Sequence, residues 1–264
     1  MTSDTSWVDS MPAVYDRALG PALFAPFAAY LAEAVVGLTP RRVLELAAGT
    51  GVATGELIAA LPGTEVVATD LNPAMVAFGA AKVPGATWRV ADALHLDEPA
   101  GSYDLVVCQF GVMFFPDKPA AFAEAARVLR PGGRLLVAVW DVVEASPFPA
   151  ALMAGIAAAR PVDPPTFVAR VPHGYPDPEQ IEADLRAGGL EPVSVERVVL
   201  QGTSPSAATL ADGFCRGTPL RFALQERGDL DELTAAIAAE MTARLGEGPV
   251  EGDLAALVVA ARRP

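Results

Sequence analysis

The chain has 264 residues, of which 52% are hydrophobic and 19% are charged, and its formal net charge is −13. A chain of this length and composition can bury a full core, which excludes an intrinsically disordered protein. The negative charge argues against a nucleic-acid partner, because an acidic surface repels a phosphate backbone.

Short apolar runs alternate with alanine-rich helical stretches over the first half of the chain, after an amphipathic segment at 22–36. This alternation is typical of a doubly wound α/β fold, in which a parallel sheet is covered by helices on both faces. Arg-Pro-Gly-Gly at 130–133 predicts a helix stop and a turn. The predicted strands are 43–47, 66–69, 87–90, 105–109 and 135–140, and the predicted helices are 54–60, 73–81 and 120–129.

The pattern changes after Trp140, where a proline-rich stretch interrupts the alternation. We expect one domain over 1–264, with insertions that cap the substrate side, because such folds keep specificity in loops above the strand ends. The later elements are a helix at 179–187, a strand at 193–200, a helical insertion at about 205–244 and a strand at 254–260. The expected parts are an N-terminal helical segment (1–40), a cofactor-binding core (41–141) and cap segments at about 142–178 and 205–247.

The strongest motif is VLELAAGTGVATG, in which an apolar strand runs into Gly49 and Gly51 and a helix follows. Glycines allow a tight turn and let a ligand lie against bare backbone, and the helix start adds free N–H groups. Nucleotide, phosphate and flavin binders use similar turns, so the motif alone does not identify the ligand. A tight turn without a ligand is the plain alternative.

Two acidic residues follow the next strands. Asp70 ends the second strand, where a carboxylate can bind the two hydroxyls of a ribose. Asn72, directly before Pro73, is better placed than Asp70 to cap the next helix, which leaves Asp70 for a ligand. Asp92 follows the third strand and could accept a hydrogen bond from the exocyclic amine of adenine, or could be a turn residue.

The ordered set VLELAAGTG, VVATDLNPAMV, ADALHL, YDLVVCQFGVMFFPD and ARVLRPGGRLLVAVW, from about residue 41 to 141, resembles the class I S-adenosylmethionine-dependent methyltransferases. The nearest resemblance is to the ubiquinone/menaquinone and small-molecule branch. It implies a seven-stranded sheet in the order 3-2-1-4-5-7-6 with the last strand antiparallel. It also implies S-adenosylmethionine as cofactor, S-adenosylhomocysteine as product, and in-line methyl transfer to a small molecule.

The resemblance also implies residue roles. Glu45 and the backbone from Ala47 through Gly49 and Thr50 to Gly51 would hold the methionine part of the cofactor. Asp70 would bind the ribose and Asp92 the adenine amine. The flanking contacts would come from Leu71, Met75, Ala93, Gln109, Phe110 and Tyr15, the last closing over the cofactor from the N-terminal segment. Ala91 stands where the family often has glycine, a mild departure.

Acceptor chemistry is less readable. A positioned sulfonium needs mainly proximity and orientation, so a general base is optional. His173, in the proline-rich cap segment, is the best base candidate, although a structural loop histidine is the favoured alternative; His95 is expected at the surface. Trp140 could line the substrate pocket or fill the core, and Phe27 is expected on the buried face of its helix. No metal site is expected, because His and Cys are too few.

Three rival functions remain at this stage. An NAD(P)-dependent oxidoreductase would share the glycine turn and the ribose acid, but no Tyr-x-x-x-Lys pair is present. A non-catalytic binding module and a cofactor-assisted reaction other than methylation are the others. An apolar or aromatic metabolite fits the alanine- and proline-rich cap segments, whose arginines are scattered and form no basic run; the sequence specifies neither the acceptor atom nor the oligomeric state.

The expected cellular compartment rests on the number of cysteines and on the N-terminal sequence. Cys108 and Cys215 are too few for a disulfide framework, and Cys108 lies in an apolar run where we expect burial. The N-terminus has neither a positive start nor an apolar signal core, and no apolar stretch reaches membrane-spanning length without interruption. We therefore expect a cytoplasmic protein without membrane insertion.

Overall fold

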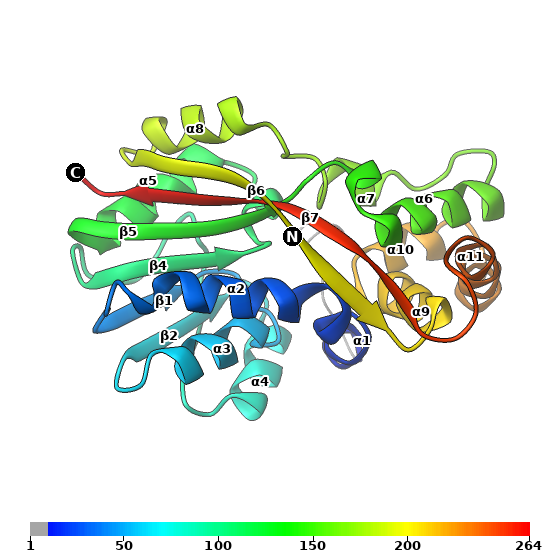
Figure 1. Cartoon of the computed structure of the whole chain (residues 1–264), viewed down its shortest axis with the longest axis horizontal. Coiled ribbons are helices and arrows are strands. Elements are labelled where there is room, and N and C mark those ends of the chain that lie inside the picture. The colour runs from blue at the N-terminus through cyan, green and yellow to red at the C-terminus, as the bar shows by residue number, and fades with distance from the viewer. Residues whose placement is uncertain (1–9) are drawn as a thin grey trace. The chain divides into compact units, whose positions relative to one another are not determined.

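The computed structural model describes residues 10–264 (Figure 1). Its seven strands form one sheet in the order β3-β2-β1-β4-β5-β7-β6, and β7 runs antiparallel to β5, which confirms the predicted fold. β1, β2, β3, β4 and β5 are parallel to one another, so their carboxyl ends meet at one edge. The strands are β1 (Arg42–Glu45), β2 (Glu65–Asp70), β3 (Thr87–Val90), β4 (Tyr103–Gln109), β5 (Leu129–Trp140), β6 (Glu191–Ser204) and β7 (Val250–Arg262).

The helices follow the expected alternation, with small shifts at their ends. Asn72 begins α4 by accepting a hydrogen bond from the backbone N–H of Ala74 at 2.8 Å, as predicted for this cap. The α-helices are α1 (Met11–Ala18), α2 (Ala25–Val36), α3 (Val52–Ala60), α4 (Pro73–Lys82), α5 (Lys118–Val128), α6 (Pro147–Ala159), α7 (Phe167–Arg170), α8 (Pro178–Ala187), α9 (Ala207–Gly217), α10 (Leu220–Gln225) and α11 (Leu230–Leu245). A π-helix, η2 (Gly20–Phe24), and two 3₁₀ turns, η3 (Val112–Phe114) and η4 (Val143–Ala145), complete the list.

Besides small shifts at strand ends, two predicted elements differ clearly from the structure. The amphipathic segment at 22–36 is not one helix, because η2 precedes α2. The predicted turn at 130–133 lies inside β5 as an irregularity: Leu129 pairs with Tyr103 and Arg134 with Leu105, so β5 carries extra residues between the two pairs. Gly132, at φ +76°, supplies the conformation that this bulge requires.

The chain forms two compact units. The sheet unit comprises residues Phe27–Trp140, Tyr175–Val198 and Ala256–Pro264. Its core is built on fully buried strand residues such as Leu44 and Leu105, and α5 packs against β5 and α8. Cys108 is buried in it, as predicted.

The helical unit comprises the described residues up to Pro26 together with Asp141–Gly174 and Val199–Ala255. Within it α11 packs against α6 and α9, and α1 packs against α9. Across residues 10–264 no single helix is both long and apolar enough to span a membrane; α1 and the stretch Gly20–Val36 reach that length and composition only as a pair, with a bend at the break between them.

Candidate functional site

The turn after β1 has an unusual backbone. Gly49 and Gly51 have φ values of +57° and +82°, and Ala47 lies in the same left-handed region at +53°. A non-glycine residue in this region is strained, and such strain concentrates at ligand sites. A Cβ on Gly51 would lie 3.1 Å from the Trp88 ring, so glycine is also favoured there by space. The turn therefore brings backbone in the left-handed conformation to the start of α3.

Asp70 joins this turn to the next strand. Its Oδ2 accepts a hydrogen bond from Gly49 N at 2.9 Å, and its Oδ1 accepts one from Asn72 N at 2.9 Å. The sequence prediction left Asp70 entirely for a ligand, whereas the structure shows that both oxygens already brace the backbone. A carboxylate has about four acceptor positions, so it can still receive ribose hydroxyls. Burial raises the pKa of Asp70, and the two N–H donors act against that rise.

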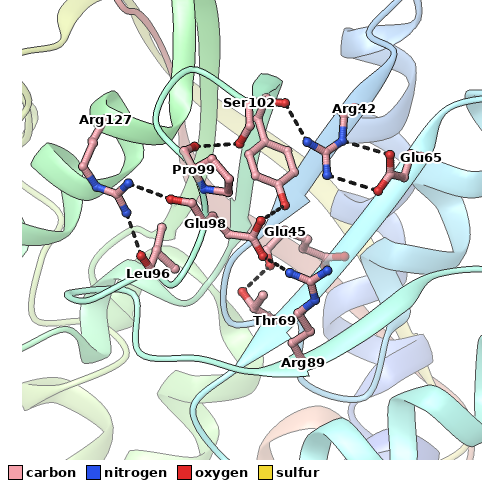
Figure 2. A network of polar contacts seen from close by, with 11 residues as sticks. Arg42, Glu45, Glu65, Thr69, Arg89, Leu96, Glu98, Pro99, Ser102 and Arg127 are labelled. Atoms are coloured by element: carbon pink, nitrogen blue, oxygen red, sulfur yellow. Dashed lines mark hydrogen bonds and ion pairs between the residues drawn. The ribbon is translucent and has the colours of Figure 1, made fainter.

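Glu45, the last residue of β1, is 1% exposed. Its Oε2 accepts a hydrogen bond from the Thr54 hydroxyl at 2.6 Å. Its backbone carbonyl accepts one from the Thr69 hydroxyl at 2.7 Å, as Figure 2 shows. Burial raises the pKa of Glu45 to about 8, and the Thr54 hydrogen bond only partly opposes this. The free protein therefore holds this carboxyl largely protonated at neutral pH.

Thr50, between the two glycines of the turn, has a buried hydroxyl that finds no hydrogen-bond partner among residues 10–264. Such a buried polar atom costs stability unless a ligand satisfies it. After β2, Leu71 is 41% exposed while Met75 is buried. The predicted adenosine-flanking pair therefore offers one accessible and one covered side chain.

Asp92 follows β3 in a turn. Its Oδ1 accepts a hydrogen bond from Leu94 N at 2.9 Å, and its carbonyl accepts one from His95 N at 2.9 Å. The turn role of Asp92 is thus present, and the adenine contact stays a prediction. The preceding Ala91 donates its N–H to the carbonyl of Asp70 at 3.0 Å, which links the two acidic positions through the backbone. His95 is exposed, as expected.

An aromatic cluster lies at the ends of β4 and β5. Phe110, in the left-handed region at φ +55°, follows Gln109 at the end of β4 and stacks on Trp140 with ring centroids 3.6 Å apart and planes 3° apart. Phe27 meets both rings edge-on, at 5.2 Å and 5.6 Å. Phe27 is fully buried, as predicted, but the sequence did not join these three rings. Adjacent strands that end at one edge are the signal that could have done so.

The next residue, Gly111, ties this edge to the glycine turn. A Cβ there would lie 2.4 Å from the Cβ of Ala47 and 2.7 Å from the Sγ of Cys108. We expect Gly111→Ala to lower the free energy of unfolding by about 1–3 kcal/mol, as overpacking does, and to weaken ligands of the turn by displacing Ala47. Chemical denaturation measures this. Gly37→Ala, with nothing within 4 Å of its Cβ, is the control. Equal stability of the two variants would contradict the close packing of Gly111 against Ala47 and Cys108.

The other two predicted residues lie in the helical unit. Tyr15 stacks on Phe24, with ring centroids 4.9 Å apart. His173 Nδ1 lies 2.6 Å from the backbone carbonyl of Asp141. A carbonyl only accepts, so Nδ1 carries the proton and Nε2 is the basic nitrogen. Burial lowers the pKa of His173, so the ring is neutral near pH 7. Its role as a general base stays a prediction.

Comparisons with known proteins agree with this geometry. Residues 43–133 match a family model described as a methyltransferase domain. The chain is 34% identical over 169 residues to the demethylmenaquinone methyltransferase of Deinococcus radiodurans, covering 57% of this chain and 68% of that one. It is 43% identical over 102 residues to the Thermus thermophilus protein of the same name, covering 37% of this chain but only 46% of that one. The fold resembles Haemonchus contortus phosphoethanolamine N-methyltransferase 2 in complex with S-adenosyl-L-methionine, with a TM-score of 0.59, 16% identity, and coverage of 100% and 60%.

Proposed function

Because this chain belongs to the class I S-adenosylmethionine-dependent methyltransferases, in the branch that contains the demethylmenaquinone enzymes, we propose that it methylates a small apolar or aromatic acceptor. Bound S-adenosylmethionine supplies an activated methyl group. The observation that carries the proposal is the hydrogen bond from Gly49 N to Asp70, which brings an acid that could bind a ribose to a strained glycine turn.

The residues of the sheet unit fit such a cofactor. Glu45, the 47–51 backbone and the Thr50 hydroxyl would take its methionine end, and Asp70 its ribose. A cationic ammonium near Glu45 would favour the ionised carboxylate, which burial otherwise disfavours. The Thr50 hydroxyl would gain the partner it lacks among the described residues. Asp92 would take the adenine amine.

The acceptor class rests on a different observation. At the ends of β4 and β5 lies the buried aromatic cluster of Phe27, Phe110 and Trp140, which would form an apolar wall for the acceptor. Flat apolar rings favour a flat apolar ligand. The chemistry would rest on positioning, which contributes roughly 7–11 kcal/mol in well-oriented reactions, and His173 would be the base if the acceptor must lose a proton. A quinol-type acceptor, aromatic and hydroxylated, combines both properties.

The test begins with the cofactor and ends with the acceptor. S-adenosylhomocysteine at 100 times its Kd should stabilise the protein by about 2.7 kcal/mol, while NADH and NADPH should not. Release of S-adenosylhomocysteine from S-adenosylmethionine is then measured with a naphthoquinol, a simple phenol and an amino acid. We expect turnover with the aromatic acceptors, fastest with the naphthoquinol. Turnover only with the amino acid, or stabilisation by a nicotinamide alone, would overturn the proposal.

A further inference from the structure

The connection between β3 and β4, residues 91–102, carries Asp92 but forms no helix or strand of its own. Its internal hydrogen bonds are those of the turn in which Leu94 and His95 donate to Asp92, and one from the Ser102 hydroxyl to the carbonyl of Pro99 at 2.7 Å. A segment of this length needs partners elsewhere to hold one conformation, because each ordered residue loses backbone entropy. The position of Asp92 therefore depends on what anchors the rest of the connection.

Two side chains of α5 provide that anchor. Arg127 donates to the carbonyl of Leu96 through Nη2 and to the carbonyl of Glu98 through Nη1, both at 2.7 Å (Figure 2). Glu124 accepts the N–H of Leu96 at 2.8 Å. The two side chains also pair with each other, with Nε to Oε1 at 2.7 Å and Nη2 to Oε2 at 2.8 Å. A forked ion pair thus holds three backbone groups by charge-assisted bonds.

The side chain of Glu98 fixes the same stretch from the other side. It is buried, accepts a hydrogen bond from the Tyr103 hydroxyl at 2.7 Å, and pairs with Arg89 (Figure 2). Tyr103 is fully buried at the start of β4, so this attachment is rigid. The stretch from Leu96 to Glu98 is therefore held on both sides, and Asp92 lies four residues before it.

We propose that Arg127 and Glu124 are positioning residues for the cofactor, which hold the 91–102 connection so that Asp92 meets the exocyclic amine of adenine. This inference rests on the proposed function. Neither side chain touches the cofactor in this scheme. Their effect on binding passes through Asp92, so it should vanish for a ligand that lacks the amine. A purely structural ion pair would affect both kinds of ligand alike.

The experiment compares S-adenosylhomocysteine with S-inosylhomocysteine, in which hypoxanthine replaces adenine and the amine is absent. Calorimetry on the full chain gives Kd for the wild type, Arg127→Gln, Asp92→Ala and the double variant. We expect Arg127→Gln to raise Kd for S-adenosylhomocysteine about tenfold, the scale of one lost hydrogen bond to a charged group, and to leave Kd for the inosine ligand within about twofold. When Asp92→Ala is already present, adding Arg127→Gln should raise the Kd for S-adenosylhomocysteine by less than about twofold.

Arg186→Gln is the matched control, because it removes the Arg186–Glu182 pair of α8, with N and O 2.7 Å apart, away from this connection. Should Arg127→Gln fail to fold, Arg127→Lys, which keeps the charge but not the fork, and Glu124→Gln carry the same comparison. Equal weakening of both ligands, or full additivity with Asp92→Ala, overturns the inference. Absence of S-adenosylhomocysteine binding by the wild type overturns the proposed function and this inference with it.

Discussion

Asp70→Ala should raise the Kd for S-adenosylhomocysteine by about a hundredfold or more, since each hydrogen bond to a charged group contributes about 1.5–3 kcal/mol and a ribose offers two hydroxyls. Part of this loss of affinity should come from the protein's own hydrogen bonds to Asp70. Gly49 N and Asn72 N both donate to this carboxylate, so its removal also loosens the glycine turn. Calorimetric titration measures the effect.

Asp70→Asn separates these two sources. An amide keeps the shape of the carboxylate and one acceptor oxygen, so this variant should retain part of the turn's hydrogen bonding while losing the charge. Its Kd for S-adenosylhomocysteine should lie between those of the wild type and Asp70→Ala. Asp97→Ala, at an exposed acidic residue of the 91–102 connection, is the control and should bind as the wild type does. A folded Asp70→Ala protein with a Kd within about threefold of the wild type would remove Asp70 from the site.

Glu45 should make the protein less stable as the pH rises. Its pKa is about 8 in the folded protein, against 4.5 for an unperturbed glutamate, so between these two pH values the folded state retains a proton that the unfolded state has lost. The contribution is complete below about pH 4.5 and is lost as pH rises towards 8, at up to about 1.4 kcal/mol per pH unit. Across that window we expect a loss of a few kcal/mol.

Glu45→Gln tests this, because the amide can still accept the Thr54 hydroxyl but does not titrate. The difference in free energy of unfolding between wild type and variant, measured by chemical denaturation at pH 5, 6.5 and 8, should fall steadily with pH. Glu33→Gln, at an exposed position of α2, controls for the loss of one charge. A difference that does not change with pH would show that Glu45 is ionised throughout.

The alternation of strands and helices was predictable from sequence, because hydrophobic runs, glycine turns and helix caps are local signals, whereas the order of the strands followed from the family resemblance. The cap at Asn72 is an example, since one dipeptide fixes it. The bulge in β5 was not predictable, because it depends on register against β4. A run of Arg-Pro-Gly-Gly is a turn by local chemistry, and only the neighbouring strand makes it part of the sheet.

The candidate site divides in the same way. Asp70, Glu45 and the glycine turn follow from motif and resemblance, but their mutual bonds do not. Arg127 lies 31 residues from Leu96 in the sequence, and no local pattern predicts that its guanidinium donates to the carbonyl of Leu96. Such contacts arise from tertiary structure alone, which is why the anchoring pair on α5 was absent from the sequence prediction.

The double engagement of Asp70 has a consequence for how a ligand is received. Two backbone N–H groups, that of Gly49 before β2 in the sequence and that of Asn72 after it, already donate to this carboxylate before a ligand binds. The conformational entropy of ordering the turn is therefore lost during folding and not at the encounter. A cofactor that meets such a surface binds as to a rigid template, with a heat-capacity change set by the area it buries and no signature of coupled folding.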